Sequence, residues 1–276
     1  MVIILTGDVH HDIVNTFYDS VRNVNVTSFL SVCTDDASLK QLAAAGLPPC
    51  VRVTPLIAVK AWAYGSAVRY QIVREMVKLS YAVLSVDYDM VFFRDPFTRL
   101  QRDTDIETMT DAVTHDFARG TQRGADVFSE HHGMWSQPTQ FRVMQLNCGC
   151  TFFRPTNATL DFLTRFVEAL AVSVVWDQAL FTELLLQPAY QARGPAGVTL
   201  RVMDVEWWAN SHVFMNLLNT WFEHVPVVVH ANYHKAHVKA WFLMQVYKRY
   251  NEPSHPVVSR QTQFARRLLR ALGDGA

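Results

Sequence analysis

Two aspartates, Asp87 and Asp89, follow an apolar run in the stretch AVLSVDYDMVFFRDPF, which covers residues 82–97. In an extended chain, residues i and i+2 face the same way, so the two carboxylates point to one side. They repel each other unless a cation lies between them. Carboxylate oxygens are the natural ligands of hard divalent cations. The pair therefore predicts a divalent-metal site at the end of a buried strand, with a simple loop cap as the alternative.

Two classes of enzyme place such a pair after an apolar strand. In haloacid-dehalogenase phosphatases the first aspartate of D-x-D-x-T/V is the phosphorylated nucleophile, and SVDYDMV fits that string. That motif normally opens its domain, whereas here it follows two earlier predicted strands and helices. In metal-dependent sugar-nucleotide glycosyltransferases the pair holds Mn²⁺ or Mg²⁺ against the diphosphate of the donor. The motif alone fits both classes.

The segment before the aspartates alternates predicted strands with helices. Strands are expected over Val2–Leu5, Val26–Cys33, Val51–Val53 and Ala82–Val86, and helices from Asp35 or Asp36 through Ala45 and over Ser66–Leu79. This order predicts an α/β fold with a Rossmann-type, mainly parallel sheet flanked by helices. Ligands of such sheets bind beyond the carboxyl ends of the strands, where Asp8 and Asp87 fall.

The second half of the chain is less regular. Residues 101–140 are polar and predict long loops, with one short strand inside them at 125–128. Later elements are expected at Gln145–Phe153 (strand), Asn157–Val172 and Asp177–Gln187 (helices), Val225–Val229 (strand) and Phe264–Leu272 (a basic amphipathic helix). Without repeats or a linker, we expect one domain over 1–276. It divides into a nucleotide-binding half (1–100), an acceptor and catalytic half (101–250) and a C-terminal basic helix (251–276).

Composition narrows the possible partners and compartments. Half of the 276 residues are hydrophobic, and 25 basic residues balance 25 acidic ones, so we expect a sizeable core and no nucleic-acid partner. The four cysteines form no CxxC pair, and we expect all four to be reduced. No uncharged run reaches the ~18 residues of a transmembrane helix. The chain is therefore expected to be cytoplasmic if it is complete, and to work in a Golgi lumen if it is the trimmed part of an anchored protein.

Four further stretches of the sequence, outside the aspartate motif, carry a resemblance to a known family. They are SVCTDDASLKQLAAAGLP, MQLNCGCTFFRPTNATLDFLTRF, VWDQALFTELL and VVVHANYHKAHVKAW. Together with VLSVDYDMVFFRDPF they resemble, in the same order, the nucleotide-diphospho-sugar transferase family of plant cell-wall arabinosyl- and xylosyltransferases, glycosyltransferase family 77. The resemblance covers most of the chain and implies a GT-A-like fold.

The resemblance also implies roles for individual residues. Asp89 would ligate the metal directly, Asp87 would contact the metal or the donor ribose, and His230 would be the third protein ligand, since imidazole suits Mn²⁺. The diphosphate would be neutralised by Lys239 and Arg69, and the nucleoside would be held by Thr6, Asp8 and Asp35. Asn147, Asp177 and Gln178 would face the sugar, with Asp177–Gln178 either acting as nucleophile or stabilising an oxocarbenium-like state. The last set also has a plainer interpretation, because Asp177 could simply cap a helix.

These roles predict a metal-dependent, retaining glycosyltransferase that uses Mn²⁺ or Mg²⁺, takes a UDP-sugar donor and glycosylates a glycan or glycoprotein acceptor. Aromatic residues in HHGMWSQP and DVEWWANSH, including Trp207 and Trp208, could stack on acceptor sugars or belong to the core. Two alternatives stay open: the phosphatase, and a protein that binds metal and nucleotide sugar without catalysis. Nucleotide release that depends on Mn²⁺ separates the three.

Overall fold

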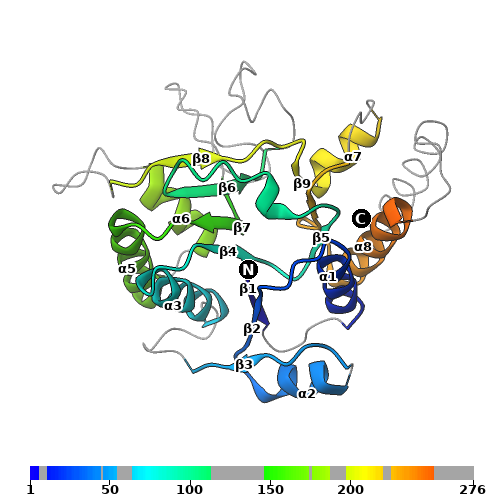
Figure 1. Ribbon diagram of the computed structural model, residues 1–276, viewed down its shortest axis with the longest axis horizontal. Helices are drawn as coiled ribbons and strands as arrows, with labels where there is room; N and C mark the ends of the chain where they lie inside the picture. The colour runs from blue at the N-terminus through cyan, green and yellow to red at the C-terminus, as the bar shows by residue number, and fades with distance from the viewer. Residues whose placement is uncertain are drawn as a thin grey trace.

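The computed structural model describes residues 1–5, 11–44, 46–54, 64–112, 146–173, 176–186, 197–219 and 225–251. Its strands form two neighbouring sheets with helices on both sides of them (Figure 1). The large sheet has the order β3-β2-β1-β4-β7-β6-β8 and the small one the order β5-β10-β9. No helix within these ranges combines the length and apolar composition needed to cross a bilayer.

The strands are β1 (Val2–Leu5), β2 (Leu30–Cys33), β3 (Val51–Arg52), β4 (Val83–Val86), β5 (Met90–Phe92), β6 (Ile106–Thr110), β7 (Leu146–Phe153), β8 (Leu200–Val202), β9 (Trp208–Asn210) and β10 (Val228–His230). The helices are α1 (His11–Asn23), α2 (Asp36–Ala44), α3 (Tyr64–Lys78), α5 (Asn157–Val172), α6 (Asp177–Leu186), α7 (Ser211–Asn219) and α8 (Ala236–Asn251), with a 3₁₀ turn η2 (Pro96–Thr98).

The large sheet is mainly parallel, as predicted, with one reversed strand. β1 is parallel to β2 and β4, β2 to β3, and β6 to β8. β7 is antiparallel to both of its neighbours, β4 and β6. The start of β7 therefore lies beside the carboxyl ends of β4 and β6, where ligands of such sheets bind.

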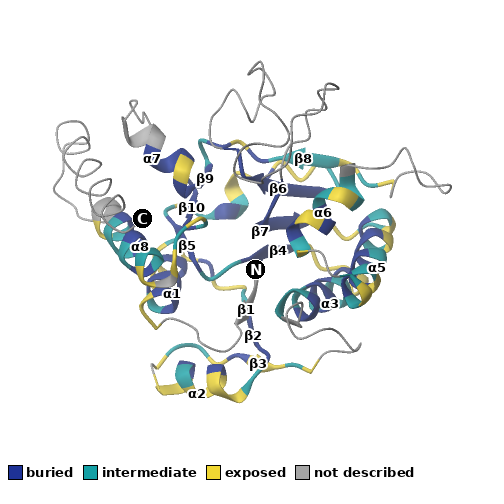
Figure 2. Cartoon of the chain, turned by 180° about the vertical axis from the view of Figure 1, so that it is seen from behind, coloured by how far each residue is buried: buried dark blue, intermediate teal, exposed yellow. Residues whose placement is uncertain are grey.

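Apolar side chains cover both faces of the central strands, which are buried along their length (Figure 2). One face packs against α3, α5 and α6 through an aromatic cluster that includes Tyr70, Phe153, Phe166 and Phe181. The rings of Tyr70 and Phe166 lie 4.6 Å apart and are tilted by 66°, within the range that aromatic pairs favour. This cluster fixes α6, which carries Asp177 and Gln178, against the sheet.

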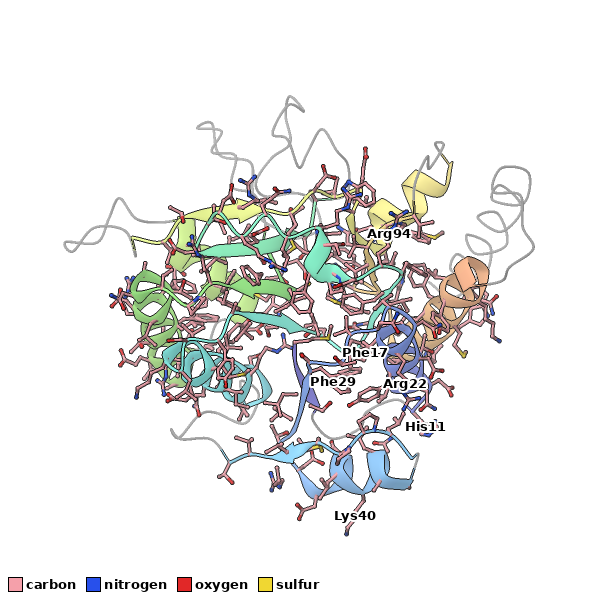
Figure 3. The ribbon with its side chains drawn as sticks, in the orientation of Figure 1. His11, Phe17, Arg22, Phe29, Lys40 and Arg94 are labelled. Carbon is pink, nitrogen blue, oxygen red and sulfur yellow. A yellow bond between two sulfur atoms is a disulfide. The ribbon has the colours of Figure 1, made fainter. Side chains whose placement is uncertain are left out.

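The other face packs against α1 and the small sheet. Phe17 of α1 is fully buried and meets Phe92 of β5 edge to face, with ring centroids 6.0 Å apart. Figure 3 shows Phe17 and Phe29 pointing into the interior, whereas Lys40 on α2 points outward. The small sheet is thus anchored to the large one by a helix that lies early in the chain.

The interpretation of 101–140 as loops was wrong for β6, which lies between β7 and the edge strand β8 in the large sheet. Its five residues are all buried, although Glu107, Thr108 and Thr110 are polar, because their polar atoms are hydrogen-bonded. A buried strand with this composition has no clear apolar pattern. The strand predicted at 125–128 and the helix predicted at 264–272 lie outside the described residues.

The expectation of four reduced cysteines was wrong for two of them. Cys33 and Cys50 form a disulfide, with Cα atoms 5.6 Å apart. Cys33 ends β2 and Cys50 directly precedes β3, and these strands pair in parallel with Val32 opposite Val51. The two cysteines are 17 residues apart in the sequence, and the pairing of β2 with β3 brings their sulfurs together. The sequence did not predict this bond because it depends on that pairing. Cys148 and Cys150 are free and buried, as expected.

Candidate active site

The two aspartates lie between the sheets. Asp87 follows β4 and Asp89 precedes β5, so the chain leaves the large sheet and enters the small one across them. β5 pairs antiparallel with β10, which places His230 opposite Met90. The Ala231 N–H also donates to the Asp89 carbonyl at 2.9 Å. Residues 140 positions apart in the sequence are thereby brought into one cluster.

Asp87, Asp89 and His230 have the geometry of a metal site. One ligand atom from each lies within 4.8 Å of the others. The Nε2 atom of His230 is 3.3 Å from Asp89 Oδ1 and 3.6 Å from Asp87 Oδ2. Neighbouring ligands around one Mg²⁺- or Mn²⁺-sized ion lie about 3 Å apart, so little movement is needed. Two carboxylates and an imidazole also suit Mn²⁺ chemically.

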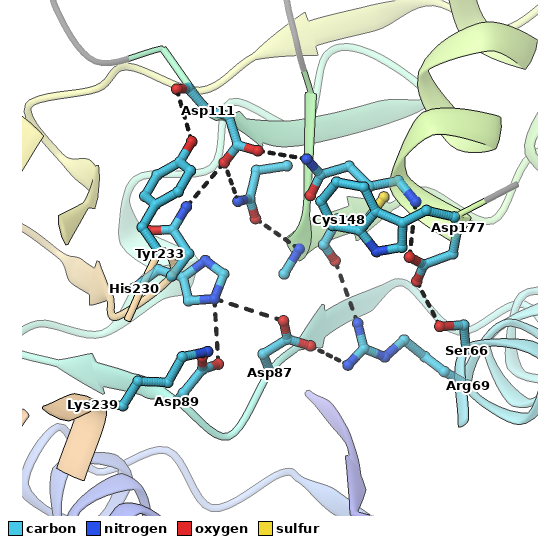
Figure 4. Close-up of a pocket in the computed structure, with 15 residues that line it drawn as sticks. Ser66, Arg69, Asp87, Asp89, Asp111, Cys148, Asp177, His230, Tyr233 and Lys239 are labelled. Atoms are coloured by element: carbon cyan, nitrogen blue, oxygen red, sulfur yellow. Dashed lines mark hydrogen bonds and ion pairs between the residues drawn. The ribbon is translucent and has the colours of Figure 1, made fainter. Parts of the chain in front are cut away.

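Two cations flank this cluster (Figure 4). The Lys239 Nζ atom donates to Asp89 Oδ2 at 2.6 Å, and Arg69 pairs with Asp87. Burial opposes ionisation of Asp89, but His230 and Lys239 outweigh it and hold the pKa of Asp89 well below its usual value. Burial likewise opposes protonation of His230, while Asp89 and Asp87 raise its pKa above 6.5. The predicted phosphate ligands Lys239 and Arg69 thus lie beside the two aspartates, and their role toward a diphosphate stays a prediction.

Gly149 allows the cluster to close. A Cβ atom at this position would lie 2.3 Å from His230 Cε1 and 2.9 Å from Asp87 Oδ2. The Gly149 carbonyl accepts from the Asp87 N–H at 2.7 Å, which fixes the backbone next to the first carboxylate. The sequence predictions did not include this residue; its signal is only a glycine inside an apolar strand, which marks a close approach of the backbone to a neighbour.

The residues predicted to face the sugar line the same cavity, whose volume is about 380 Å³. Asp177 opens α6, and its carboxylate accepts from the Ser66 hydroxyl at 2.6 Å and from the Gln178 N–H at 2.8 Å. Gln178 is buried, and Asn147 at the start of β7 accepts from the Gly149 N–H at 2.8 Å. The structure therefore places Asn147, Asp177 and Gln178 in one cavity with Asp87, Asp89 and His230; that they face the sugar stays a prediction.

Asp111 was missed. It follows β6, is 8% exposed and accepts hydrogen bonds from Asn147, Gln178 and Asn232. Nothing in the sequence singled it out, because the surrounding segment was interpreted as a loop. The signal that could have found it is a polar residue at the end of a strand, and that strand was not predicted.

The nucleoside-binding predictions divide into two groups. Thr6 and Asp8 lie outside the described residues. Asp35 caps α2: its carboxylate accepts from the Ser38 N–H at 2.8 Å and from the Ser38 hydroxyl at 3.0 Å. It does not line the 380 Å³ cavity within the described part of the chain. A role for Asp35 in holding the nucleoside stays a prediction.

Trp207 and Trp208, for which both acceptor stacking and a core position were considered, do not line this cavity. Trp208 is in β9 and is 3% exposed, so it belongs to the core. Trp207 is half-buried, and the Cζ atom of Arg99 lies 3.8 Å from the centre of its ring. It lines a second cavity of about 360 Å³. HHGMWSQP lies outside the described residues. Trp176, by contrast, lines the catalytic cavity and is 57% exposed.

The chain is similar to known proteins over the range that forms this cavity. The family model for nucleotide-diphospho-sugar transferases matches residues 24–240, a range that includes every residue of the cavity. Arabinosyltransferase RRA2 of Arabidopsis thaliana is 35% identical over 173 residues, which are 61% of this chain and 40% of that protein. The chain therefore spans less than half of the length of this relative.

Solved glycosyltransferases share the fold. The galactosyltransferase LgtC, solved with donor and acceptor sugar analogues, superimposes with a TM-score of 0.50 at 13% identity, covering 96% of this chain and all of that one. The glycosyltransferase GlyE of Streptococcus pneumoniae gives 0.52 at 11% identity, over 98% of this chain and 63% of that one. These likenesses identify a GT-A fold. From the family match over most of its length, the chain belongs to the nucleotide-diphospho-sugar transferase family.

Proposed function

We propose that this protein is a metal-dependent, retaining glycosyltransferase that transfers a sugar from a UDP-sugar to a glycan or glycoprotein acceptor. The observation that carries the proposal is the cluster of Asp87, Asp89 and His230 in one cavity with Asp177 and Gln178. A site that holds a cation and a sugar side by side suits a nucleotide-diphospho-sugar better than a phosphomonoester. Membership of the transferase family supports the same choice over the phosphatase.

The residues of the cavity would have separate roles in such a reaction. A divalent ion held by Asp87, Asp89 and His230 would neutralise the diphosphate. Lys239 and Arg69, which contact Asp89 and Asp87, would stabilise the negative charge that grows on the diphosphate as the glycosidic bond breaks. Their carboxylate partners are the metal ligands themselves, so binding of metal would release both cations toward the phosphates.

Retention is supported by the state of the remaining carboxylates. An inverting enzyme needs a carboxylate that is free to take the acceptor proton. In the described part of the cavity, the carboxylates outside the metal cluster are Asp111 and Asp177. Each already accepts hydrogen bonds at both of its oxygens. Neither is placed as a free base, whereas Gln178 offers a neutral amide beside the sugar.

The donor sugar is proposed to be a pentose, since the curated relative is an arabinosyltransferase. The experiment that tests the whole proposal incubates the chain with a panel of UDP- and GDP-sugars and Mn²⁺, with and without EDTA, and measures free nucleotide. UDP release that requires metal, and that increases with a glycan acceptor, is expected. An NMR assignment of the product anomer tests retention. Absence of metal-dependent release across the panel, with acceptors added, would overturn the proposal.

An oxidising compartment, such as a Golgi-type lumen, is proposed as the place of action. The disulfide between Cys33 and Cys50 supports it, because such bonds persist outside the reducing cytosol. Differential alkylation of the protein isolated from its own cells tests this point, and both thiols reacting without prior reduction would contradict it.

A further inference from the structure

The backbone on both sides of Asp111 is fixed by hydrogen bonds to side chains. Its own backbone carbonyl accepts from the Tyr233 hydroxyl at 3.1 Å. The carbonyls of the residues on either side, Thr110 and Ala112, accept from the Asn210 side chain at 3.2 and 2.8 Å. Three successive carbonyls are thus tied to side chains of the small sheet and of the turn after it. The Asp111 carboxylate has a fixed position in the cavity.

Three side-chain amides converge on this carboxylate. Asn147 Nδ2 donates to Oδ1 at 2.5 Å, Asn232 Nδ2 donates to Oδ1 at 2.9 Å, and Gln178 Nε2 donates to Oδ2 at 2.5 Å. The donors come from three separate elements: the start of β7, the turn that follows His230, and the first turn of α6. Figure 4 shows Asp111 at the centre of these bonds, across the cavity from Asp87 and Asp89.

A carboxylate without its proton can only accept hydrogen bonds, whereas an amide can rotate by 180° and present either oxygen or nitrogen. Asp111 therefore selects one of the two orientations of each amide, with the NH₂ group turned toward itself. For Asn147 the oxygen then meets the Gly149 N–H, and for Asn232 it meets the Ser211 N–H at 3.3 Å. The Gln178 side-chain oxygen accepts no hydrogen bond from the described residues. Of the three amide oxygens, it is therefore the one that is available to a ligand.

We propose that Asp111 is a positioning residue that locks the Gln178 amide with its carbonyl oxygen available to the donor sugar. This inference rests on the proposed function and deepens it. As the bond to the diphosphate breaks, positive charge develops at the anomeric carbon, and a carbonyl oxygen stabilises it while an NH₂ group opposes it. The orientation of one amide thus decides the sign of its contribution to the reaction.

The same carboxylate links the two halves of the site. Gln178 belongs to α6 on the large sheet, whereas Asn232 lies two residues after the metal ligand His230. One residue therefore sets the distance between the sugar side and the metal side of the cavity. Loss of the carboxylate would leave the proposed metal ligands in place, because the pairing of β5 with β10 holds Asp89 and His230 and the bond to the Gly149 carbonyl holds Asp87. It would free the amide.

The test uses four variants of the full chain. Asp111→Asn keeps the shape but offers an NH₂ group, so it cannot accept from all three amides. In the double variant Asp111→Asn with Gln178→Glu, the side chain at 111 donates the hydrogen bond and the side chain at 178 accepts it. The second carboxylate oxygen at 178 then faces the sugar. Gln178→Glu alone places two carboxylates together. Asp105→Asn is the matched control: Asp105 lies at the other end of β6 and accepts from Thr156 at 2.6 Å and from Thr199 at 2.8 Å, outside the cavity.

We expect Asp111→Asn to lower kcat at least about tenfold, while the donor KM and the Kd for Mn²⁺ change by less than about twofold. The exchanged pair is expected to be faster than either of its single variants, and Asp105→Asn to keep wild-type kcat with a lower Tm. A separate readout needs no activity: the Gln178 side-chain NH₂ signals in ¹⁵N NMR should be protected from exchange in the wild type and lose protection in Asp111→Asn.

The outcomes separate the two proposals. If the wild type releases no nucleotide from any donor, the proposed function fails and the NMR comparison still decides whether Asp111 locks the amide. Wild-type kcat in Asp111→Asn, an equal loss of kcat in Asp105→Asn, or unchanged protection of the Gln178 amide would each overturn the positioning role.

Discussion

The Gly149 backbone lies against the His230 ring so closely that a Cβ atom would fall 2.3 Å from Cε1. Gly149 lies in β7 of the large sheet and His230 in β10 of the small sheet, so this contact joins the two sheets. Any side chain at Gly149 must displace the imidazole or move β7.

Gly149→Ala is accordingly expected to weaken Mn²⁺ binding by at least about tenfold, which corresponds to about 1.4 kcal/mol, because His230 must leave its position beside Asp87 and Asp89. Titration calorimetry with Mn²⁺ measures the effect. Ser85→Ala, which removes a buried hydroxyl from the adjacent strand β4, is the control and should bind as the wild type does. Equal Kd values for Gly149→Ala and the wild type would contradict the packing argument.

Removal of one metal ligand should separate metal binding from folding. Asp89→Asn is expected to abolish metal-dependent nucleotide release and to raise the Kd for Mn²⁺ by about 10²-fold or more, since direct ligands dominate affinity. Addition of EDTA to the wild type should have the same effect on release, and an excess of Mn²⁺ should reverse it. Far-UV circular dichroism of the variant should match the wild type. Full activity of Asp89→Asn in EDTA would show that the cluster holds no catalytic ion.

Metal affinity should depend on pH through His230. A protonated imidazole cannot bind a metal, and the neighbouring aspartates raise the pKa of His230 above 6.5 despite its burial. Affinity for Mn²⁺ should therefore fall steadily as the pH drops below that raised value, by up to about tenfold per unit. A Kd independent of pH between 6 and 8 would be inconsistent with His230 as a ligand.

The same group predicts the opposite trend for stability without metal. Because the pKa of His230 is higher in the folded state, its stabilising contribution is complete below pH 6.5 and is lost as the pH rises through the folded-state pKa. In EDTA the Tm should decrease over this upper range, and it should decrease less in His230→Gln. The lowered pKa of Asp89 acts only in acid: its contribution is present above about pH 4 and is lost below it.

The disulfide should stabilise the edge of the large sheet. Cys33→Ser with Cys50→Ser is expected to lower the free energy of unfolding by about 3 kcal/mol, the value for a closed loop of similar length. Chemical denaturation in the absence and presence of a reductant measures it. The reductant should lower the stability of the wild type and leave the double variant unchanged. A reductant-insensitive wild type would contradict the bond.

Trp176 should contribute to acceptor binding, since it is 57% exposed at the rim of the catalytic cavity. An exposed aromatic face beside a polar site suits stacking on a sugar ring. Trp176→Ala is expected to raise the acceptor KM by about tenfold, or 1.4 kcal/mol, with the donor KM unchanged. Tyr81→Ala removes an aromatic ring that is 59% exposed and does not line the cavity, and it serves as the control. Equal effects of the two substitutions would remove Trp176 from the acceptor site.

The sequence predicted the helices α2, α3, α5 and α6, which have strong local signals, but it did not predict α1. The helix expected at Asn157–Val172 matches α5 residue for residue, and its start is fixed by Thr156, whose hydroxyl accepts from the Thr159 N–H. Of the small sheet, only β10 was expected, as the strand at Val225–Val229, whereas β5, β9 and the large-sheet strand β6 were not predicted. These strands have three to five residues, and their stability depends on partners that lie far away in the chain.

Local sequence by itself predicted the chemistry at Asp87 and Asp89, because two like charges after an apolar strand favour a cation between them. Only the tertiary structure decided what shares that cation. The pairing of β5 with β10 brought His230 to it, the reversed β7 delivered Gly149 and Asn147, and β6 delivered Asp111. These contacts join residues that are 36 to 150 positions apart. No local periodicity encodes such distances, because they arise from how the strands pair and how the sheets pack together.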